Sequence, residues 1–204
     1  MNIADTPAHW PVVSSAELLR SRLVTVRTDK VLTPDHDLAE RDVVLHPGAV
    51  AVLALDAADR ILMIRQYRHP VGRLQWEIPA GLRDVPGEEP WVTASRELME
   101  EAGYRAKEWR VLADYYSSPG YSTERLRVFL ARDLEPVPAA ERQFVPQAEE
   151  AHLLLGWLPL DEAVGKVFAG ELHNGPAALA IMAGYAARSE GYDRLRPADA
   201  PQEQ

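Results

Sequence analysis

Three apolar runs rich in β-branched residues follow one another between residues 41 and 68, and they constrain the fold of this chain more than any other feature. The runs read RDVVLH, GAVAVLALD and RILMIRQYR, and they are separated by Pro47-Gly48 and by residues 56–60. Short apolar runs bounded by turn-forming residues are typical of β-strands. The sequence therefore predicts a meander of strands in this part of the chain.

The other patterned segments predict strands around one central helix, with further helices near the end. Strands are indicated at 12–33 (one strand or two), 76–79, 109–116, 125–131 and 153–158. The central helix falls between Pro90 and Gly103, since proline is favoured at the first helical position and glycine just after the last. Residues 160–169 and 177–188 also read as helices. This order of elements predicts an α+β domain with a mixed sheet.

The length of 204 residues fits one domain with a small appendage. We expect a β-rich N-terminal region over residues 1–40, a main domain over 41–190 and a disordered tail over 191–204. The N-terminal strands carry few charges on one face, which is compatible with an interface.

Composition excludes several classes of function. The chain has no cysteine, so it has no disulfide, no zinc–thiolate site and no thiol nucleophile. Its formal net charge of −9 argues against a nucleic-acid binder, which needs a surplus of Lys and Arg. The best apolar run, residues 48–58, is shorter than the roughly 18 residues of a membrane span, and the N-terminus lacks the features of a signal peptide. We therefore expect a cytoplasmic protein with neither a membrane nor a nucleic acid as partner.

Residues 96–103 (RELMEEAG) are the most informative for function, because three carboxylates fall within one helical turn. At about 100° per residue, Glu97 and Glu101 lie about 40° apart, and Glu100 lies about 60° to the other side of Glu97. Like charges at this spacing repel each other, whereas hard cations such as Mg²⁺ favour carboxylate ligands. The helix is therefore a candidate metal platform. A Glu pair beside an arginine is also common on solvated helix faces, so this pair alone leaves a structural interpretation open.

The longer stretch from Gly81 to Tyr104, GLRDVPGEEPWVTASRELMEEAGY, resembles the Nudix box. The usual box reads G-x5-E-x7-R-E-U-x-E-E-x-G-U, where U is apolar, and the half from Glu88 onward matches it. The first half has six residues between Gly81 and Glu88, where the usual pattern has five. We interpret the extra residue as a loop insertion around Pro86-Gly87, which leaves open whether Glu88 or Glu89 is the first box glutamate.

This resemblance implies a Nudix hydrolase with a mixed β-sheet sandwich and helices on both sides. In that family the box carboxylates bind Mg²⁺, with Mn²⁺ as a substitute, at the diphosphate of a nucleoside diphosphate substrate. The implied metal ligands are the carboxylates of Glu97, Glu100 and Glu101 and the main-chain carbonyl of Ala80. Glu97 and Glu101, as primary ligands, are also the expected catalytic residues, and Arg96 is expected to pair with a box glutamate.

Three further features resemble the branch of ADP-ribose and nucleotide-sugar pyrophosphatases. Pro119 lies 16 residues after Gly103, the run QYRHP precedes WEIPAG, and SPGYSTE resembles a loop of that branch. The resemblance implies substrate contacts from a set of residues on these motifs and beside the box glycine: Arg68, Leu82, Ser118, Pro119 and Glu124.

The resemblance also implies a homodimer, because the N-terminal strands of this branch often cross to a partner subunit. Arg41 would then be a second arginine that reaches a substrate phosphate, with a solvated strand-edge arginine as the alternative. The general base in this branch follows the later strands, and the run EEAHLLLGW begins with Glu149 and Glu150. We expect Glu150, with Glu149 as the alternative, to deprotonate or orient the attacking water.

The predicted function is Mg²⁺-dependent hydrolysis of the diphosphate of ADP-ribose to AMP and ribose 5-phosphate. One alternative keeps this chemistry and changes the substrate to GDP-mannose, UDP-glucose or a dinucleotide. The other alternative is a Nudix-fold sensor that binds a nucleotide without hydrolysing it. The intact box glutamates and the lack of an appended basic segment argue against the sensor.

Overall fold

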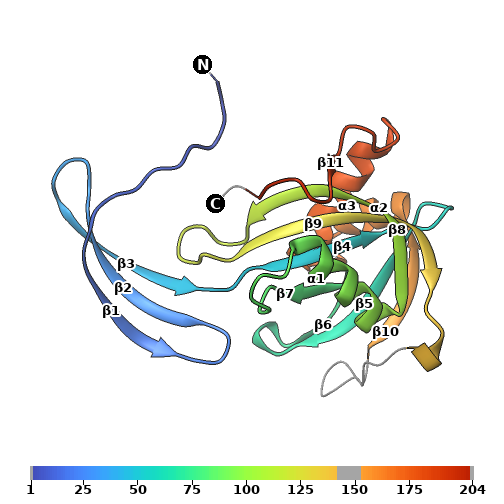
Figure 1. Ribbon diagram of the computed structural model, residues 1–204, viewed down its shortest axis with the longest axis horizontal. Helices are drawn as coiled ribbons and strands as arrows, with labels where there is room; N and C mark the ends of the chain where they lie inside the picture. The colour runs from blue at the N-terminus through green and yellow to red at the C-terminus, as the bar shows by residue number, and fades with distance from the viewer. Residues whose placement is uncertain (1, 142–152, 203–204) are drawn as a thin grey trace. The chain divides into compact units, whose positions relative to one another are not determined.

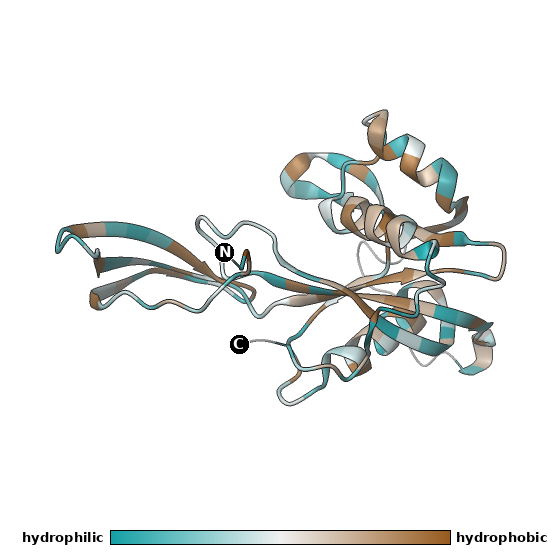
Figure 2. Ribbon diagram, turned by 90° about the horizontal axis from the view of Figure 1, so that it is seen from above, coloured by the Kyte–Doolittle hydropathy of each residue, from teal (hydrophilic) through white to brown (hydrophobic). Residues whose placement is uncertain are grey.

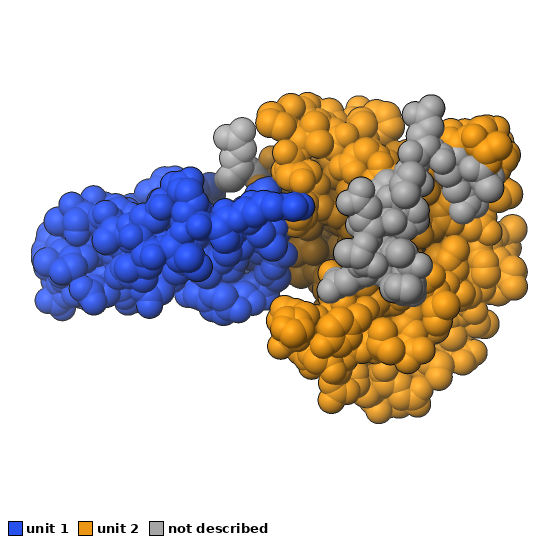
Figure 3. All heavy atoms as spheres, turned by 90° about the horizontal axis from the view of Figure 1, so that it is seen from below, with its two compact units in different colours: residues 1–47, 116–124 blue, residues 48–115, 125–204 orange. Residues whose placement is uncertain are grey.

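The structure is a computed structural model that describes residues 2–141 and 153–202. It divides into two compact units, coloured separately in Figure 3. Unit 1 contains Met1–Pro47 and Tyr116–Glu124, and unit 2 contains Gly48–Tyr115 and Arg125–Gln204. The first boundary, at Pro47, differs from the expected one at residue 40, because a strand that ends at Leu45 pairs with the N-terminal strands.

Unit 1 is built on a three-stranded antiparallel sheet in the order β1-β2-β3, formed by Val12–Arg20, Thr25–Leu32 and Leu38–Leu45 (Figure 1). Ser21 closes the turn between β1 and β2, because its hydroxyl donates to the carbonyl of Val24 and accepts from the amide of Val24, each at 3.0 Å. Hydrophobic and hydrophilic residues mix along these strands (Figure 2), and all nine residues of β1 are exposed. The segment at residues 12–33, for which the sequence predicts one strand or two, thus forms the two strands β1 and β2.

Unit 2 contains two sheets. The five-stranded sheet has the order β11-β8-β9-β4-β7, in which β4 runs parallel to β9 and antiparallel to β7. The second sheet is antiparallel, with the order β10-β5-β6. The strands are β4 (Ala49–Ala54), β5 (Arg60–Arg68), β6 (Arg73–Glu77), β7 (Ala80–Leu82), β8 (Tyr104–Tyr116), β9 (Arg125–Pro136), β10 (Leu154–Pro159) and β11 (Arg196–Pro197).

The predicted meander is only partly right. Its three apolar runs do form the consecutive strands β3, β4 and β5, but these strands lie in three different sheets. The reason is that β4 pairs with β9 and β7, which are distant in sequence, so it is a central strand, and its run meets the next one through an isolated bridge between Leu55 and Ile61.

The helices begin and end close to the predicted positions. Helix α1 (Pro90–Glu97) has proline at its first turn and continues as a π-helical turn, η2 (Leu98–Ala102), up to Gly103 in the left-handed conformation at φ 70°. Helices α2 (Leu160–Phe168) and α3 (Gly175–Arg188) follow. The side chain of Asn174 caps α3 by accepting from the amide of Ala177 at 2.9 Å. No helix among the described residues is long and apolar enough to cross a membrane.

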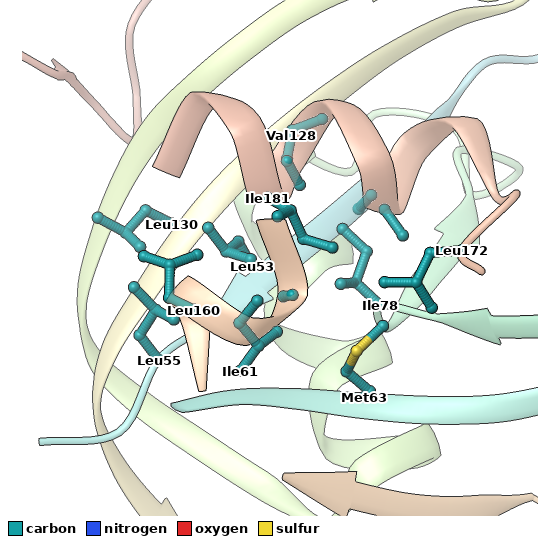
Figure 4. Packing of buried hydrophobic residues seen from close by; sticks show 14 of the residues in the cluster. Leu53, Leu55, Ile61, Met63, Ile78, Val128, Leu130, Leu160, Leu172 and Ile181 are labelled. Carbon is teal, nitrogen blue, oxygen red and sulfur yellow. The ribbon is translucent and has the colours of Figure 1, made fainter. Parts of the chain in front are cut away.

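The core lies on both faces of the five-stranded sheet, because successive residues of a strand point to opposite faces. Val50, Val52 and Ala54 of β4 pack in one cluster with Leu98 of η2. Their neighbours Ala51, Leu53 and Leu55 pack in the other cluster with residues of α2 and α3, as Figure 4 shows for Leu53, Leu160 and Ile181. With helices on both faces of a mixed sheet, the predicted α+β class is confirmed.

The C-terminal residues differ from the expected disordered tail. Strand β11 pairs with β8, and the carbonyl oxygens of Ala200 and Pro201 accept from the guanidinium of Arg127 at 2.6 and 3.1 Å. Arg127 is only 1% exposed, and its other partner is Asp114, at 2.7 and 2.9 Å. A buried guanidinium has to be hydrogen-bonded, so the end of the chain is held in place by an arginine far away in the sequence.

Candidate active site

The box glycine and the box helix lie against each other. The amide of Ala80 in β7 donates to the carboxylate of Glu101 at 2.9 Å. A Cβ atom on Gly81 would lie 2.0 Å from Cδ of Glu97, far inside van der Waals contact. Only glycine therefore leaves room for the Glu97 side chain over β7, which explains why the motif begins with this residue type.

Arg96 is the centre of the carboxylate cluster. Its Nη1 contacts Glu97 at 2.7 Å and Glu100 at 3.1 Å, and its Nη2 contacts Glu88 at 3.3 Å. Burial alone would lower the pKa of Arg96, but its hydrogen bond with Glu88 and the charges of Glu97, Glu100 and Glu88 raise that pKa above its usual value. Arg96 therefore pairs with three acidic residues of the motif at once, as the sequence predicts for at least one.

The structure separates the two candidates for the first box glutamate. Glu88 contacts Arg96 and also accepts from the hydroxyl of Thr93 at 2.8 Å. Glu89 is instead the N-cap residue of α1, where its carbonyl oxygen accepts from the amides of Val92 and Thr93. The residue beside Arg96 is thus Glu88, and the extra residue of the motif lies in the loop before it.

The carboxylate of Glu97 lies where burial disfavours its charged form. Its side chain is 14% exposed, and burial raises its pKa to about 7, an effect that Glu100 and Asp84 increase and Arg96 opposes. Burial therefore disfavours the charged form of Glu97 close to neutral pH, and a bound cation would favour that form.

The donor set fits a hard divalent cation in its chemistry, since three carboxylates and the carbonyl of Ala80 are all oxygen ligands. In the described part of the chain, however, no three His, Cys, Asp or Glu side chains are close enough together to hold a metal ion. Glu97 and Glu100 point to Arg96, and Glu101 points to the amide of Ala80. Holding an ion would require these side chains to turn.

The angular spacing expected for the three glutamates on an ideal α-helix does not hold. The amide of Gly103 donates to the carbonyl oxygens of both Leu98 and Met99, and the bond to Leu98 spans five residues. This π-turn is wider than an α-turn and changes the direction of each side chain on it. Such turns often occur at functional sites.

Arg68 ends β5 and pairs with a residue that the sequence analysis missed. Its Nε and Nη2 donate to the two carboxylate oxygens of Glu77 at 2.9 and 2.7 Å. The side chain of Glu77 is 2% exposed and that of Arg68 is 41% exposed. The position of Glu77 inside the apolar WEIPAG run was the available signal, since a charged residue in such a run is rarely buried without a partner.

The other predicted substrate residues lie in different parts of the molecule. Leu82 is the last residue of β7 in unit 2 and pairs with Ala49 of β4. Arg41 lies on β3 in unit 1, where its Nη1 donates to the carbonyl of Glu40 at 2.8 Å. Residues 116–124 also belong to unit 1 and include Ser118, Pro119 and Glu124.

Within this loop the hydroxyl of Ser117 donates to the Glu124 carboxylate at 2.5 Å, and Nε2 of His46 lies 3.8 Å from the same carboxylate. The carbonyl of Ser118 accepts from the amides of Tyr121 and Ser122, which closes the turn that contains Pro119. Glu149 and Glu150, the two candidates for the general base, lie outside the described residues.

The sequence model of the NUDIX domain matches residues 45–178, so the chain belongs to the Nudix hydrolase family, as the box predicts. The ADP-ribose pyrophosphatase of Mycobacterium tuberculosis (strain ATCC 25618 / H37Rv) is 42% identical over 190 residues, which cover 93% of this chain and 89% of that protein. The ADP-ribose pyrophosphatase of Bacillus subtilis (strain 168) is 34% identical over 170 residues, covering 83% and 89%. A crystal structure of an ADP compounds hydrolase, 20% identical, has a TM-score of 0.76 and covers 92% of this chain and 99% of its own, which shows the shared fold.

Proposed function

We propose that this chain hydrolyses the diphosphate of ADP-ribose to AMP and ribose 5-phosphate, with Mg²⁺ as the cofactor and Mn²⁺ as a substitute. The observation that carries the proposal is the intact cluster of box carboxylates around Arg96, against β7. The similarity to two proteins named ADP-ribose pyrophosphatase supports this choice of substrate.

In this proposal the carboxylates of Glu97, Glu100 and Glu101 and the carbonyl of Ala80 hold the divalent ion. A bound Mg²⁺ supplies charge neutralisation on the diphosphate oxygens and lowers the pKa of water. Arg96 keeps Glu97 and Glu100 in place and favours the charged form of Glu97 until the ion binds. Glu150, with Glu149 as the alternative, takes the proton of the attacking water.

The proposed substrate contacts come from two arginines, from Leu82 and from the loop at residues 116–124. Arg68 contacts the diphosphate, since a guanidinium matches the geometry of phosphate oxygens. Arg41 is a second phosphate contact, and the remaining proposed contacts come from Leu82, Ser118, Pro119 and Glu124.

We also propose that the sheet of unit 1 forms a homodimer interface. Four apolar residues of β1 are more than half exposed: Val12 at 52%, Val13 at 60%, Leu18 at 63% and Leu19 at 55%. Exposed apolar residues concentrated on one strand are characteristic of a surface that another chain covers.

The test of the proposed activity is a substrate panel with the purified chain and Mg²⁺: ADP-ribose, GDP-mannose, UDP-glucose and a dinucleotide. We expect ADP-ribose to have the highest kcat/KM and to give AMP and ribose 5-phosphate in equal amounts. A higher kcat/KM for a substrate without adenine would contradict the ADP-ribose assignment and favour the nucleotide-sugar alternative. Unchanged substrates after prolonged incubation with Mg²⁺ or Mn²⁺ would contradict an enzymatic function and favour a nucleotide sensor.

A further inference from the structure

We propose that Glu77 is a positioning residue for Arg68, which it holds at a fixed place relative to the box carboxylates. This inference rests on the proposed function, in which Arg68 contacts the substrate diphosphate. Glu77 itself does not touch the substrate in this account and acts only through the arginine.

The two partners differ greatly in exposure, and this difference determines which one is fixed. Glu77 is 2% exposed, whereas the side chain of Arg68 is 41% exposed. A carboxylate removed from water is retained only where a partner offsets its lost hydration, so the buried end of the pair is fixed. The guanidinium lies at the surface end and takes its position from that carboxylate.

The geometry of the contact fixes an orientation as well as a distance. The Nε and Nη2 groups of Arg68 donate side by side to the two oxygens of Glu77, at 2.9 and 2.7 Å. Two parallel hydrogen bonds hold the guanidinium in one plane, which a single contact would not do. The pairing uses the edge of the guanidinium formed by Nε and Nη2.

The segment that carries Glu77 also carries the start of the box. Glu77 is the last residue of β6, and after Ile78 and Pro79 the next strand begins at Ala80, whose amide donates to Glu101. This short connection is rigid, because Ile78 is 1% exposed and the carbonyl of Pro79 accepts from the amide of Val52 at 2.8 Å. Arg68 and the box carboxylates are therefore tied to one inflexible stretch of backbone.

A second positive charge, Arg73, lies opposite Arg68 across the hairpin as its register partner in the β5-β6 pair. Like charges opposite each other on neighbouring strands repel. Without the carboxylate of Glu77, this repulsion would favour other rotamers of Arg68. A role in stabilising the hairpin alone is the competing explanation, and the experiment has to separate the two.

The experiment is a double-mutant cycle with Glu77→Gln and Arg68→Lys, read out as KM and kcat for ADP-ribose with Mg²⁺. Glu77→Gln is nearly isosteric, and Arg68→Lys keeps the charge beside Glu77, so both are chosen to preserve the fold. Each single variant is expected to raise KM roughly tenfold with kcat within about threefold of the parent, and Glu77→Gln should add less than about twofold in the Arg68→Lys background. Glu77→Asp, which keeps the charge, should recover part of the loss.

Asp114→Asn is the matched control, because Asp114 and Arg127 form another bidentate pair, whose link to the box segment runs through Gln202 to Arg83 and not to the box carboxylates. This variant should lower the thermal unfolding midpoint and leave KM unchanged. The proposal is overturned if Glu77→Gln leaves KM unchanged, if it raises KM equally in both backgrounds, or if Asp114→Asn raises KM as much.

A spectroscopic readout separates failure of this inference from failure of the proposed function. If the parent hydrolyses none of the panel substrates, the proposed function fails, and the Nε–H resonance of Arg68 in a ¹⁵N NMR spectrum then decides the positioning claim. A sharp, slowly exchanging resonance in the parent that is lost in Glu77→Gln supports it. A resonance that is unchanged in Glu77→Gln overturns it.

Discussion

At the residue scale, the site depends on the absence of a side chain at Gly81 of β7, because the carboxylate of Glu97 takes up the space that a Cβ atom there would need. The position that a Cβ on residue 81 would take lies 2.2 Å from Oε1 of Glu97 as well as 2.0 Å from its Cδ. One methyl group here would therefore move a proposed metal ligand, although residue 81 lies at the surface of the sheet and not in the core.

We expect Gly81→Ala to lower kcat/KM for ADP-ribose by about 100-fold or more, because displacing a reacting group by about 1 Å can cost that much. Stability should change little, since the Glu97 side chain can swing out. Gly165→Ala is the control, because nothing lies within 4 Å of a Cβ on Gly165. Kinetics and thermal unfolding of both variants check this, and a Gly81→Ala enzyme with parental turnover would contradict the packing argument.

The contacts that the sequence did and did not predict differ in whether one motif contains both partners, and not in sequence separation, since Arg96 and Glu88 are 8 residues apart and Arg68 and Glu77 are 9. Arg96, Glu97, Glu100 and Glu88 belong to one motif, so their contacts follow from local spacing. Arg68 and Glu77 are not opposite each other in their hairpin, where the register sets Arg68 against Arg73 and Glu77 against Ile64, so neither residue type nor strand register alone predicts their contact.

At the scale of elements, the box helix shows where a correct helix prediction still gives wrong geometry. Pro90 and Gly103 mark its two ends correctly, but the turn that carries Glu100 and Glu101 is a π-turn. Propensity and hydrophobic period indicate a helix without distinguishing its hydrogen-bond register, so directions of side chains computed for an ideal α-helix fail there.

The C-terminal segment is the other element that composition describes wrongly. Its polar, proline-containing sequence favours disorder, yet Asp114 joins Arg127 to Arg196 of β11, which it contacts at 2.8 Å. The order of the tail therefore depends on a network of partners that are more than 70 residues apart, as the contact of Arg127 with Ala200 shows.

This network predicts a pH dependence of stability. Burial would raise the pKa of Asp114, but hydrogen bonds from Arg127 and Arg196 hold it below its usual value of 3.8. A carboxylate with a lowered pKa in the folded state contributes stability above its unfolded pKa, and that contribution is lost as the pH falls through the folded pKa. The free energy of unfolding should therefore fall as the pH drops below about 4.

Asp114→Asn removes this contribution and leaves Arg127 buried without its carboxylate, so we expect a loss of about 3 kcal/mol at neutral pH. Denaturant unfolding of both proteins between pH 7 and pH 3 measures the difference. The two curves should approach each other in acid, and a difference that is constant over this range would contradict the assigned role of Asp114.

At the scale of the whole molecule, the chain consists of a well-packed unit 2 and a unit 1 whose first strand is exposed at every position. Sequence pattern predicted the strands of unit 1, but the expectation that a partner chain covers them came from the family resemblance, because a partner chain leaves no periodicity of its own in the sequence. A homodimer through β1 is the expected explanation.

We expect Leu18→Asp to convert a dimer into a monomer in sedimentation velocity, since a charge in an apolar interface is costly to desolvate. Phe168→Asp in α2 is the matched control, because Phe168 is 76% exposed in unit 2 and should leave the oligomeric state unchanged. A monomeric parent, or a dimeric Leu18→Asp variant, would show that β1 is not the interface.

The central claim is that the box carboxylates of this chain support Mg²⁺-dependent hydrolysis of ADP-ribose. The most direct measurement is kcat for ADP-ribose at saturating Mg²⁺ in the parent and in Glu101→Gln, with thermal unfolding of both as the check on folding. We predict a loss of about 10³-fold or more in kcat with a native unfolding midpoint. Turnover by Glu101→Gln within about threefold of the parent would contradict the assignment of this carboxylate and the account built on it.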